Sequence, residues 1–231
     1  MFMKKRKSIY IYLVIILLLI TSISIFSLNI YSKNILDKEV KSLLKKDISK
    51  DKYTINTKSL FKYSKVEKAI KEYMKDYSDN IKKANDIIND ETIKVILSSS
   101  NYKNDGPKFE KSLKLLEVKQ KEFTNIINKL LKMTDEKEIM KYINDYNLSD
   151  KYIEIYKKYM FGKEYNKDIE NNKNIIKKIN DTGLNIINTD NAVLKMLKDN
   201  SDKWVIKEES IYFYSNDLLQ QYDNLVQNLQ K

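Results

Sequence analysis

The chain has 231 residues, with 43 Lys plus Arg against 32 Asp plus Glu, a formal net charge of +11, no Cys and no His. Without Cys there is no disulfide, thiolate nucleophile, lipidated cysteine or Cys-based metal site, and without His the commonest metal ligand and general base are missing. Three Gly and one Pro leave little material for β-turns or phosphate-binding loops. The composition therefore favours an all-α protein and argues against an enzyme.

Residue usage also indicates the kind of genome that encodes the chain. Arg6 is the only arginine, while Lys, Ile, Asn and Tyr, which have AT-rich codons, are plentiful. We therefore expect a low-GC genome, and a Gram-positive bacterium as the source. The same bias argues against interpreting the Lys and Asn content as functional enrichment.

The N-terminal segment predicts a membrane anchor. Residues 1–7 form a basic tail that contains Lys4, Lys5, Arg6 and Lys7, and residues 8–32 carry no charge. As a helix, this uncharged segment is about 37 Å long, more than the roughly 30 Å of a bilayer hydrocarbon core. The basic side stays in the cytoplasm, so the rest of the chain is expected outside the cell membrane, behind a single-pass signal anchor.

A cleaved signal peptide is the alternative for the same segment. Its apolar region would run over residues 9–20 and end at the small-residue site Ser22, Ile23, Ser24. Apolar residues continue beyond this site to Ile30, and no Ala-x-Ala pattern occurs, which favours the anchor. Both alternatives export residues 33–231, and cleavage would make the protein secreted.

Residues 33–57 predict a stalk helix followed by a hinge. Apolar residues recur at helical spacing directly after the membrane segment, at Ile35, Leu36, Val40, Leu43, Leu44 and Ile48. The polar stretch over residues 47–57 is the expected hinge. Residues 58–231 are then the extracytoplasmic helical domain.

The spacing of apolar residues in that domain predicts successive amphipathic helices. The first is predicted over residues 59–100, with apolar positions at Val66, Ile70, Tyr73, Tyr77, Ile81, Ala84 and Ile88. Residues 104–107 contain the only Pro and are the expected turn of a helical hairpin. The returning helix carries Phe109, Leu113, Leu116, Phe123, Ile127 and Leu130.

Shorter elements complete the predicted architecture. Asp135 and Glu138 fit a capping box for a short helix, and Ser149 is the expected cap of the next one, which ends near Gly162. A long helix follows with Ile169, Ile176, Ile179, Gly183 and Ile186, where Gly183 permits close packing or a kink. Residues 204–206 and 211–214 fit a small β-hairpin, and Leu218, Tyr222, Leu225 and Leu229 a final helix. We expect an elongated antiparallel helical bundle, whose coiled-coil spacing fits self-association equally well.

Four local patterns are candidates for a functional site, and each also has a purely structural interpretation. Asp135, Glu136 and Glu138, or Asp168 and Glu170, could supply paired carboxylates, but solvated helix faces are favoured. Ser98, Ser99 and Ser100 lack a nucleophile motif and fit a helix end. The turn at residues 102–109 can carry contacts at a bundle tip, and Trp204, Tyr212 and Tyr214 can form an aromatic platform or hairpin core.

Charge and composition together define the expected function. Lys and acidic residues alternate along the predicted helices rather than clustering, which argues against a nucleic-acid partner. No cofactor, metal ligand or catalytic residue is predicted. We expect a non-enzymatic interaction or scaffold protein of the cell envelope, which binds an envelope protein or itself; the alternative is a ligand-binding ectodomain for a wall polymer, lipid or small molecule.

Overall fold

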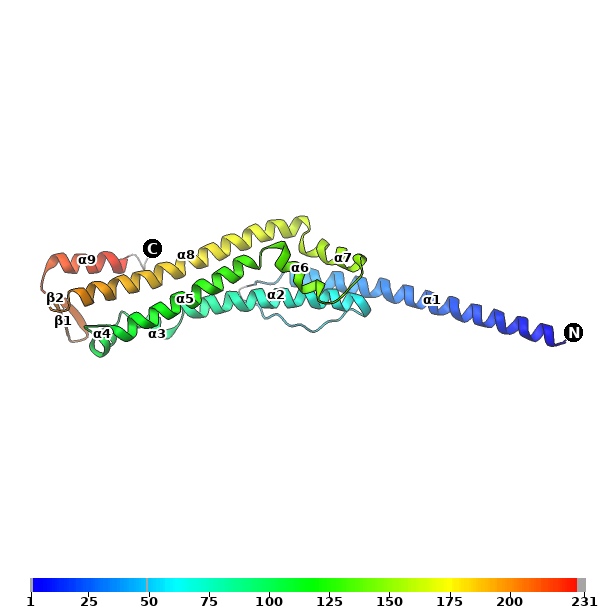
Figure 1. Cartoon of the computed structure of the whole chain (residues 1–231), viewed down its shortest axis with the longest axis horizontal. Coiled ribbons are helices and arrows are strands. Elements are labelled where there is room, and N and C mark those ends of the chain that lie inside the picture. The colour runs from blue at the N-terminus through cyan, green and yellow to red at the C-terminus, as the bar shows by residue number, and fades with distance from the viewer. Residues whose placement is uncertain (1, 49, 228–231) are drawn as a thin grey trace. The chain divides into compact units, whose positions relative to one another are not determined.

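The structure is a computed structural model that describes residues 2–48 and 50–227, with side chains described throughout except at residues 2–20, 23 and 163–169. In chain order its elements are α1 (Phe2–Leu43), α2 (Phe61–Ile88), α3 (Glu91–Lys94), α4 (Ser99–Asp105), α5 (Glu110–Lys132), α6 (Glu136–Asn144), α7 (Asp150–Met160), α8 (Lys163–Asp199), β1 (Trp204–Lys207), β2 (Ser210–Phe213) and α9 (Asn216–Gln227). Figure 1 shows this arrangement. The described residues are mostly helical, and their strands form one small antiparallel sheet, as the sequence predicts.

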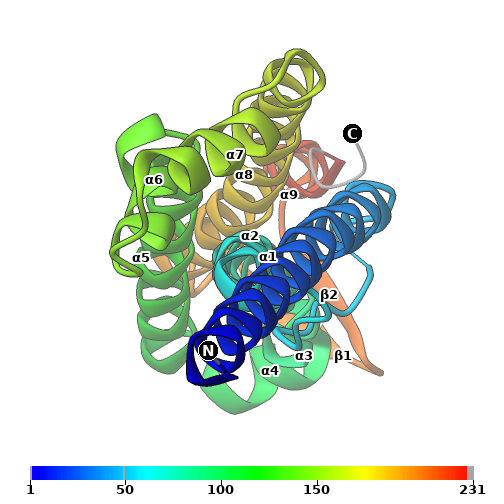
Figure 2. The same ribbon diagram turned by 90° about the vertical axis from the view of Figure 1, so that its right-hand side faces the viewer.

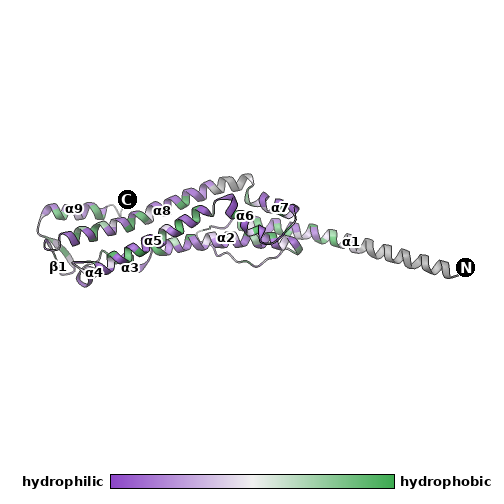
Figure 3. Ribbon diagram, in the orientation of Figure 1, coloured by the Kyte–Doolittle hydropathy of each residue, from purple (hydrophilic) through white to green (hydrophobic). Residues whose placement is uncertain are grey.

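The chain forms two compact units, each built from two separate stretches of sequence. Unit 1 contains Met1–Asp76 and Ile139–Tyr165, and unit 2 contains Tyr77–Glu138 and Asn166–Lys231. Helix α2 therefore contributes residues to both units. Residues of α2 are buried in both units, among them Val66 and Ile70 in unit 1 and Ile81 and Ala84 in unit 2. Hydrophobic and hydrophilic residues alternate along α5, which lies in unit 2 (Figure 3).

In unit 1, α1 and α2 run in parallel. The Leu60 backbone N–H donates to Ser32 Oγ, and the Ser32 hydroxyl donates to the Leu60 carbonyl oxygen, both over 2.8 Å. Further along both helices, the Lys71 amine donates to the Glu39 carboxylate over 3.1 Å. Residues 50–60 therefore return along α1 before α2 begins, and the two helices lie side by side (Figures 1 and 2). This parallel pair departs from the antiparallel expectation, because the predicted hinge segment is long enough to run back to Ser32.

Tyrosines attach the short helices α6 and α7 to the rest of unit 1. Tyr142 of α6 donates to Asp76 of α2 over 2.9 Å, and Tyr146, two residues after the end of α6, donates to Glu72 of α2 over 2.8 Å. The hydroxyl of Tyr156, a fully buried residue of α7, donates to the Ile139 carbonyl oxygen over 2.8 Å. The Tyr156 ring fills the core, whereas Tyr142 and Tyr146 are half-buried, and each of the three hydroxyls satisfies a polar group.

Unit 2 is an antiparallel arrangement of the end of α2, α5 and α8. Asn80 contacts Met133, whereas Lys119 pairs with Asp90, so α2 and α5 run in opposite directions. The Gln120 amide donates to Asn188 over 3.1 Å, which places α8 beside α5. This part of the predicted bundle follows the expected antiparallel pairing.

The predicted helix over residues 59–100 is wrong in its length. Helix α2 begins at Phe61 and ends at Ile88, and two short helices follow it. Asp90 accepts a hydrogen bond from the Thr92 N–H over 2.9 Å, and Ser98 Oγ accepts one from the Asn101 N–H over 3.2 Å. These side chains cap α3 and α4, because an Asp or Ser at a helix start satisfies amide donors that have no partner within the helix. The chain therefore reverses through α3 and α4 rather than at residues 104–107 alone.

The elements after α5 follow the sequence prediction. Helices α6, α7, α8 and α9 and the hairpin β1–β2 lie where the patterns place them, and Leu229 of the predicted final helix lies outside the described residues. In the hairpin Trp204 pairs with Phe213, and Glu208 and Glu209 both have positive φ, as a two-residue hairpin turn requires. Ser149 precedes α7 as expected, but its side chain makes no capping hydrogen bond.

The predicted membrane segment coincides with part of α1, which runs without a break from Phe2 to Leu43. Among the residues whose side chains are described, no helix is long and apolar enough to span a bilayer. Most of residues 8–32 lie outside that set, so the anchor stays a prediction. Large apolar side chains just before Ser32 are exposed, namely Ile25, Phe26, Leu28, Ile30 and Tyr31, whereas Ser32 is buried.

Candidate functional site

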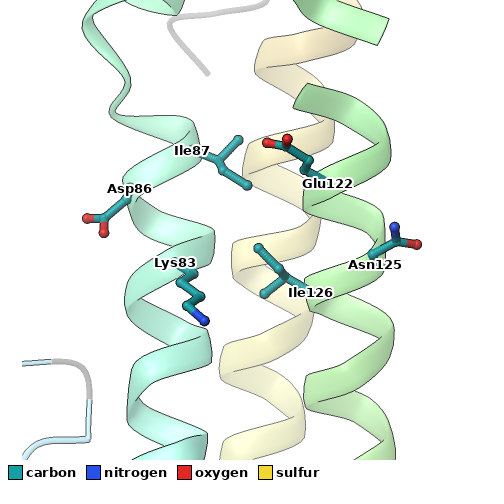
Figure 4. A pocket seen from close by; sticks show the side chains of 6 residues that line it. All are labelled: Lys83, Asp86, Ile87, Glu122, Asn125 and Ile126. Atoms are coloured by element: carbon teal, nitrogen blue, oxygen red, sulfur yellow. The ribbon is translucent and has the colours of Figure 1, made fainter. Parts of the chain in front are cut away.

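A groove between α2 and α5 of unit 2 is the leading candidate for a binding site. Its volume is about 410 Å³, and it is lined by Lys83, Asp86 and Ile87 of α2 and by Glu122, Asn125 and Ile126 of α5. In Figure 4, Ile87 and Ile126 point into the space between the two helices, and Asp86 points away from it. The groove therefore has an apolar floor between charged and polar edges.

The two edges of the groove carry opposite charges. The Lys83 amine lies at the α2 edge, and the Glu122 carboxylate lies near Ile87 (Figure 4). Both residues are exposed. An apolar strip with flanking charges of both signs is the chemistry that binds one face of an amphipathic helix.

An ion pair joins the same two segments beyond the groove. The Lys119 amine of α5 lies 2.7 Å from the carboxylate of Asp90, the residue that caps α3. The hydrogen bond from Lys119 and those from Thr92 hold the pKa of the Asp90 carboxyl well below its usual range. This pair helps to fix the spacing of α2 and α5, and hence the width of the groove.

A buried ionic cluster in unit 1 is the strongest polar constellation among the described residues. Glu67, which is fully buried, accepts hydrogen bonds from the Lys58 N–H, the Ser59 N–H, the Ser59 hydroxyl and the Lys71 amine, over 2.5 to 3.0 Å. The Lys71 amine also donates to Glu39 and to the Asn56 carbonyl oxygen. The Lys71 amine thus has three acceptors, which is as many as it can serve, so its role is structural.

Electrostatics keeps the two acids of this cluster ionised. Burial raises the pKa of Glu67, but hydrogen bonds from Lys71, Ser59 and Lys58 outweigh it and lower the net pKa. The pKa of Glu39 is lowered chiefly by its hydrogen bond from Lys58, 2.8 Å away. The cluster therefore fastens residues 56–59 and α1 onto α2 through charged hydrogen bonds.

Unit 2 holds a buried carboxyl of a different kind. Asp190 of α8 is 3% exposed, and among the described residues none forms a hydrogen bond or ion pair with it. Burial raises its pKa to about 7. The nearby Tyr102 shares a hydrogen bond of 3.1 Å between its hydroxyl and that of Tyr222, and burial, Tyr222 and Asp190 together raise the Tyr102 pKa.

The acidic residues singled out in the sequence form no common site. Asp135 and Glu136 are exposed, and Glu138 pairs with Lys132 at 3.3 Å. Glu170 is exposed, and Asp168 lies outside the residues with described side chains. In the described part of the chain no group of three acids is placed to hold a metal ion.

The serines and the turn have structural roles. Ser98 caps α4, so it begins a helix, and Ser99 and Ser100 are the first residues of that helix. Within residues 102–109, Tyr102 and Phe109 are buried and their rings lie 5.8 Å apart. Asp105 accepts hydrogen bonds from the Ser112 hydroxyl and N–H, both over 2.7 Å, which joins the turn to the start of α5.

The predicted aromatic platform is not formed by its three residues. Trp204 stacks on Phe109 at 6.0 Å and donates from its indole N–H to the Leu197 carbonyl oxygen over 2.7 Å. Tyr212 and Tyr214 are largely exposed, on other positions of the hairpin. Trp204 is therefore half-buried and packs against the core residue Phe109 of unit 2. Gly183 has the packing role that was expected, because a Cβ there would overlap the Phe123 ring.

Two features of the structure escaped the sequence patterns. The groove pairs residues about 40 positions apart in sequence, and nothing local indicates such a pairing. Glu67 and Lys71 did carry a signal, because they stand four residues apart beside the apolar stripe that contains Val66 and Ile70.

Comparison of the chain with the models of protein families, with curated proteins and with solved structures gave no match. The residues of this chain are therefore the basis of the functional proposal.

Proposed function

We propose that the protein is a single-pass, membrane-anchored interaction or scaffold protein of a Gram-positive cell envelope, with residues 33–231 outside the membrane. Its partner is a second envelope protein, which presents the apolar face of an amphipathic helix to the groove between α2 and α5. No chemical step is assigned to the chain.

The groove is the observation that carries this proposal. Ile87 and Ile126 form its floor, and Lys83 and Glu122 stand at its edges. A helix laid along α2 and α5 would cover the two isoleucines and could pair its own charges with the lysine and the glutamate. Grooves between helices commonly bind helical segments in this way.

The membrane part of the proposal rests on the N-terminal sequence. An uncharged run of 25 residues follows four basic residues, and this order indicates a signal anchor with the C-terminal part outside. The exposed apolar side chains of α1 just before Ser32 are consistent with this placement.

Capture of the partner from intact cells tests the proposal. A photo-reactive residue replaces Ile126 in the groove or, as the matched control, Leu131, an exposed leucine of the same helix that does not line the groove. We expect a cross-link to one envelope protein from position 126, and loss of that complex in Ile126→Lys but not in Leu131→Lys. Equal cross-linking from both positions, or a complex that survives Ile126→Lys, would contradict the proposal.

Ligand binding is the second candidate function. The groove volume of about 410 Å³ lies in the usual range of small-molecule sites, roughly 300–1,000 Å³. A wall polymer, lipid or small molecule that bound there would raise the thermal midpoint of the purified protein, and Ile126→Lys would abolish the shift. A shift with such a ligand, together with no protein cross-link, would favour this function over the first.

A further inference from the structure

Leu60 and Phe61 form an exposed apolar pair at the level of α1 where burial begins. From Ile25 to Tyr31 the large apolar side chains of α1 are exposed, and burial starts at Ser32. The hydrogen bonds between Ser32 and the Leu60 backbone place the start of α2 at this same level. Leu60 and Phe61 therefore stand beside Tyr31, and their side chains are 41%, 58% and 59% exposed, respectively.

The backbone presents Phe61 outward at a conformational cost. Its φ is 53°, in the left-handed region that a bulky residue seldom adopts. Helix α2 could bury an aromatic side chain at its start, as Tyr63 does two residues later. An unfavourable backbone conformation that leaves a large apolar ring in water indicates a partner for that ring.

Three exposed lysines lie near the Tyr63 and Tyr152 rings, at the start of α2 and of α7. The amines of Lys62 and Lys151 lie 5.7 and 5.6 Å from the centre of the Tyr152 ring. That ring lies 5.1 Å from the Tyr63 ring. Burial and Tyr152 raise the pKa of Tyr63, and the charge of the nearby Lys33 opposes this rise. All three lysines are exposed.

Two acids lie in the same region and offset only part of this charge. Asp150 is exposed next to Lys151, and Asp37 accepts a hydrogen bond from Tyr159. The surface thus combines large apolar side chains with a local excess of positive charge.

We propose that Leu60, Phe61 and Tyr31 insert into the outer face of the membrane and that Lys33, Lys62 and Lys151 bind anionic lipid headgroups. Aromatic rings favour the boundary between headgroups and hydrocarbon, and lysines near a membrane surface are attracted by anionic lipids. The surface is continuous with the apolar side chains of α1, so the lipid that would hold the anchor would also meet α2. This inference rests on the proposed anchor and adds a second contact between unit 1 and the bilayer.

Single cysteines test the contact in the full-length protein, which has no Cys of its own. The variants Leu18→Cys, Leu60→Cys and Leu44→Cys are labelled with a spin probe in vesicles of phosphatidylcholine and phosphatidylglycerol. Leu60 and Leu44 are matched, since both are leucines exposed to 41%. Leu44 follows Ser32 by 12 residues, which is about 18 Å along a helix.

We expect the probe at position 60 to be accessible to oxygen and protected from a water-soluble relaxation agent, whereas the probe at position 44 shows the reverse. If position 18 is in lipid and position 60 behaves as position 44 does, the second contact is refuted and the anchor stands. If position 18 is in water, the anchor itself fails, and the second contact fails with it.

The contacts of the three lysines with lipid headgroups are tested by a second comparison, with the same probe at position 60. Replacing Lys33, Lys62 and Lys151 together by Gln should remove the increase in lipid exposure that phosphatidylglycerol causes over phosphatidylcholine alone. An increase that persists in the triple variant would refute the headgroup contacts.

Discussion

Replacing Lys71 by Met is the sharpest test of the buried ionic cluster in unit 1. Methionine keeps an unbranched apolar stem but removes the amine that donates to Glu67, Glu39 and the Asn56 carbonyl oxygen. Glu67 would remain fully buried with its charge and with three donors, from the N–H groups of Lys58 and Ser59 and the Ser59 hydroxyl. The variant therefore leaves a buried carboxylate without its cation.

The expected loss of stability in Lys71→Met follows from the contacts that Glu67 loses and keeps. Removing one member of a buried ion pair costs about 3–5 kcal/mol of the free energy of unfolding. Because three hydrogen bonds to Glu67 remain, we expect the lower end, about 3 kcal/mol. For a chain of this size each kcal/mol lowers the thermal midpoint by about 2–4 °C, so the fall is roughly 6–12 °C.

The assay is urea unfolding followed by circular dichroism, with hydrogen exchange of the Lys58 and Ser59 amides as a local probe. Lys65→Met is the control, because it is the same substitution at an exposed position of the same helix, where a change within about 0.5 kcal/mol is expected. Equal losses in the two variants would refute the assigned role of the cluster. The double variant Glu67→Gln/Lys71→Met should recover part of the loss, since it removes the uncompensated charge.

The same cluster predicts a pH dependence. The pKa of Glu67 and that of Glu39 are both below the ordinary value of 4.5 in the folded protein. The folded state therefore binds fewer protons than the unfolded state as these acids titrate, and the stability they contribute is present above that value. It should be lost as the pH falls from 4.5 through the lowered pKa values, with a smaller loss in the double variant. An equal acid loss in the double variant would contradict this assignment.

Two further substitutions test unit 2. Gly183→Ala should destabilise the protein by about 1–3 kcal/mol despite the better helix propensity of Ala, because its Cβ would overlap the Phe123 ring. Thermal unfolding measures this loss, and an Ala variant more stable than the parent would contradict the close packing. For Asp190, whose pKa burial raises from 3.8 to about 7, ionisation disfavours the folded state, so stability should fall as the pH rises from 4 to 7, by at most about 1.4 kcal/mol per pH unit. Asp190→Asn should remove that slope and be more stable than the parent at pH 8; an unchanged slope in urea unfolding would show that another group is responsible.

Sequence periodicity located most of the helices because each buries one face. In α5 the stripe residues Leu116, Phe123, Ile127 and Leu130 are buried, and in α9 the stripe residue Leu218 is buried. The hairpin β1–β2 was equally local, since its β-branched and aromatic residues flank a two-residue turn. Burial of one face is a property of the element, so a single segment of sequence suffices to predict it.

The break after Ile88 shows where periodicity alone misled. The apolar residues Ile93 and Ile96 lie three positions apart and are buried, so core positions continue beyond the end of α2. The Asp90 and Ser98 side chains nevertheless start new helices there. Capping competes with the continuation of a helix, and a stripe of apolar residues does not reveal which of the two is more stable.

Composition, helix positions, the hairpin and the predicted anchor follow from the sequence, because each depends on residues that are neighbours in the chain. Tertiary structure decided the parallel course of α1 and α2, the burial of Glu67 with Lys71, and the groove between Ile87 and Ile126. These features depend on which faces meet across long stretches of chain. Apolar faces of similar helices attract one another without direction, so only specific contacts, such as those of Ser32 with Leu60, select one arrangement.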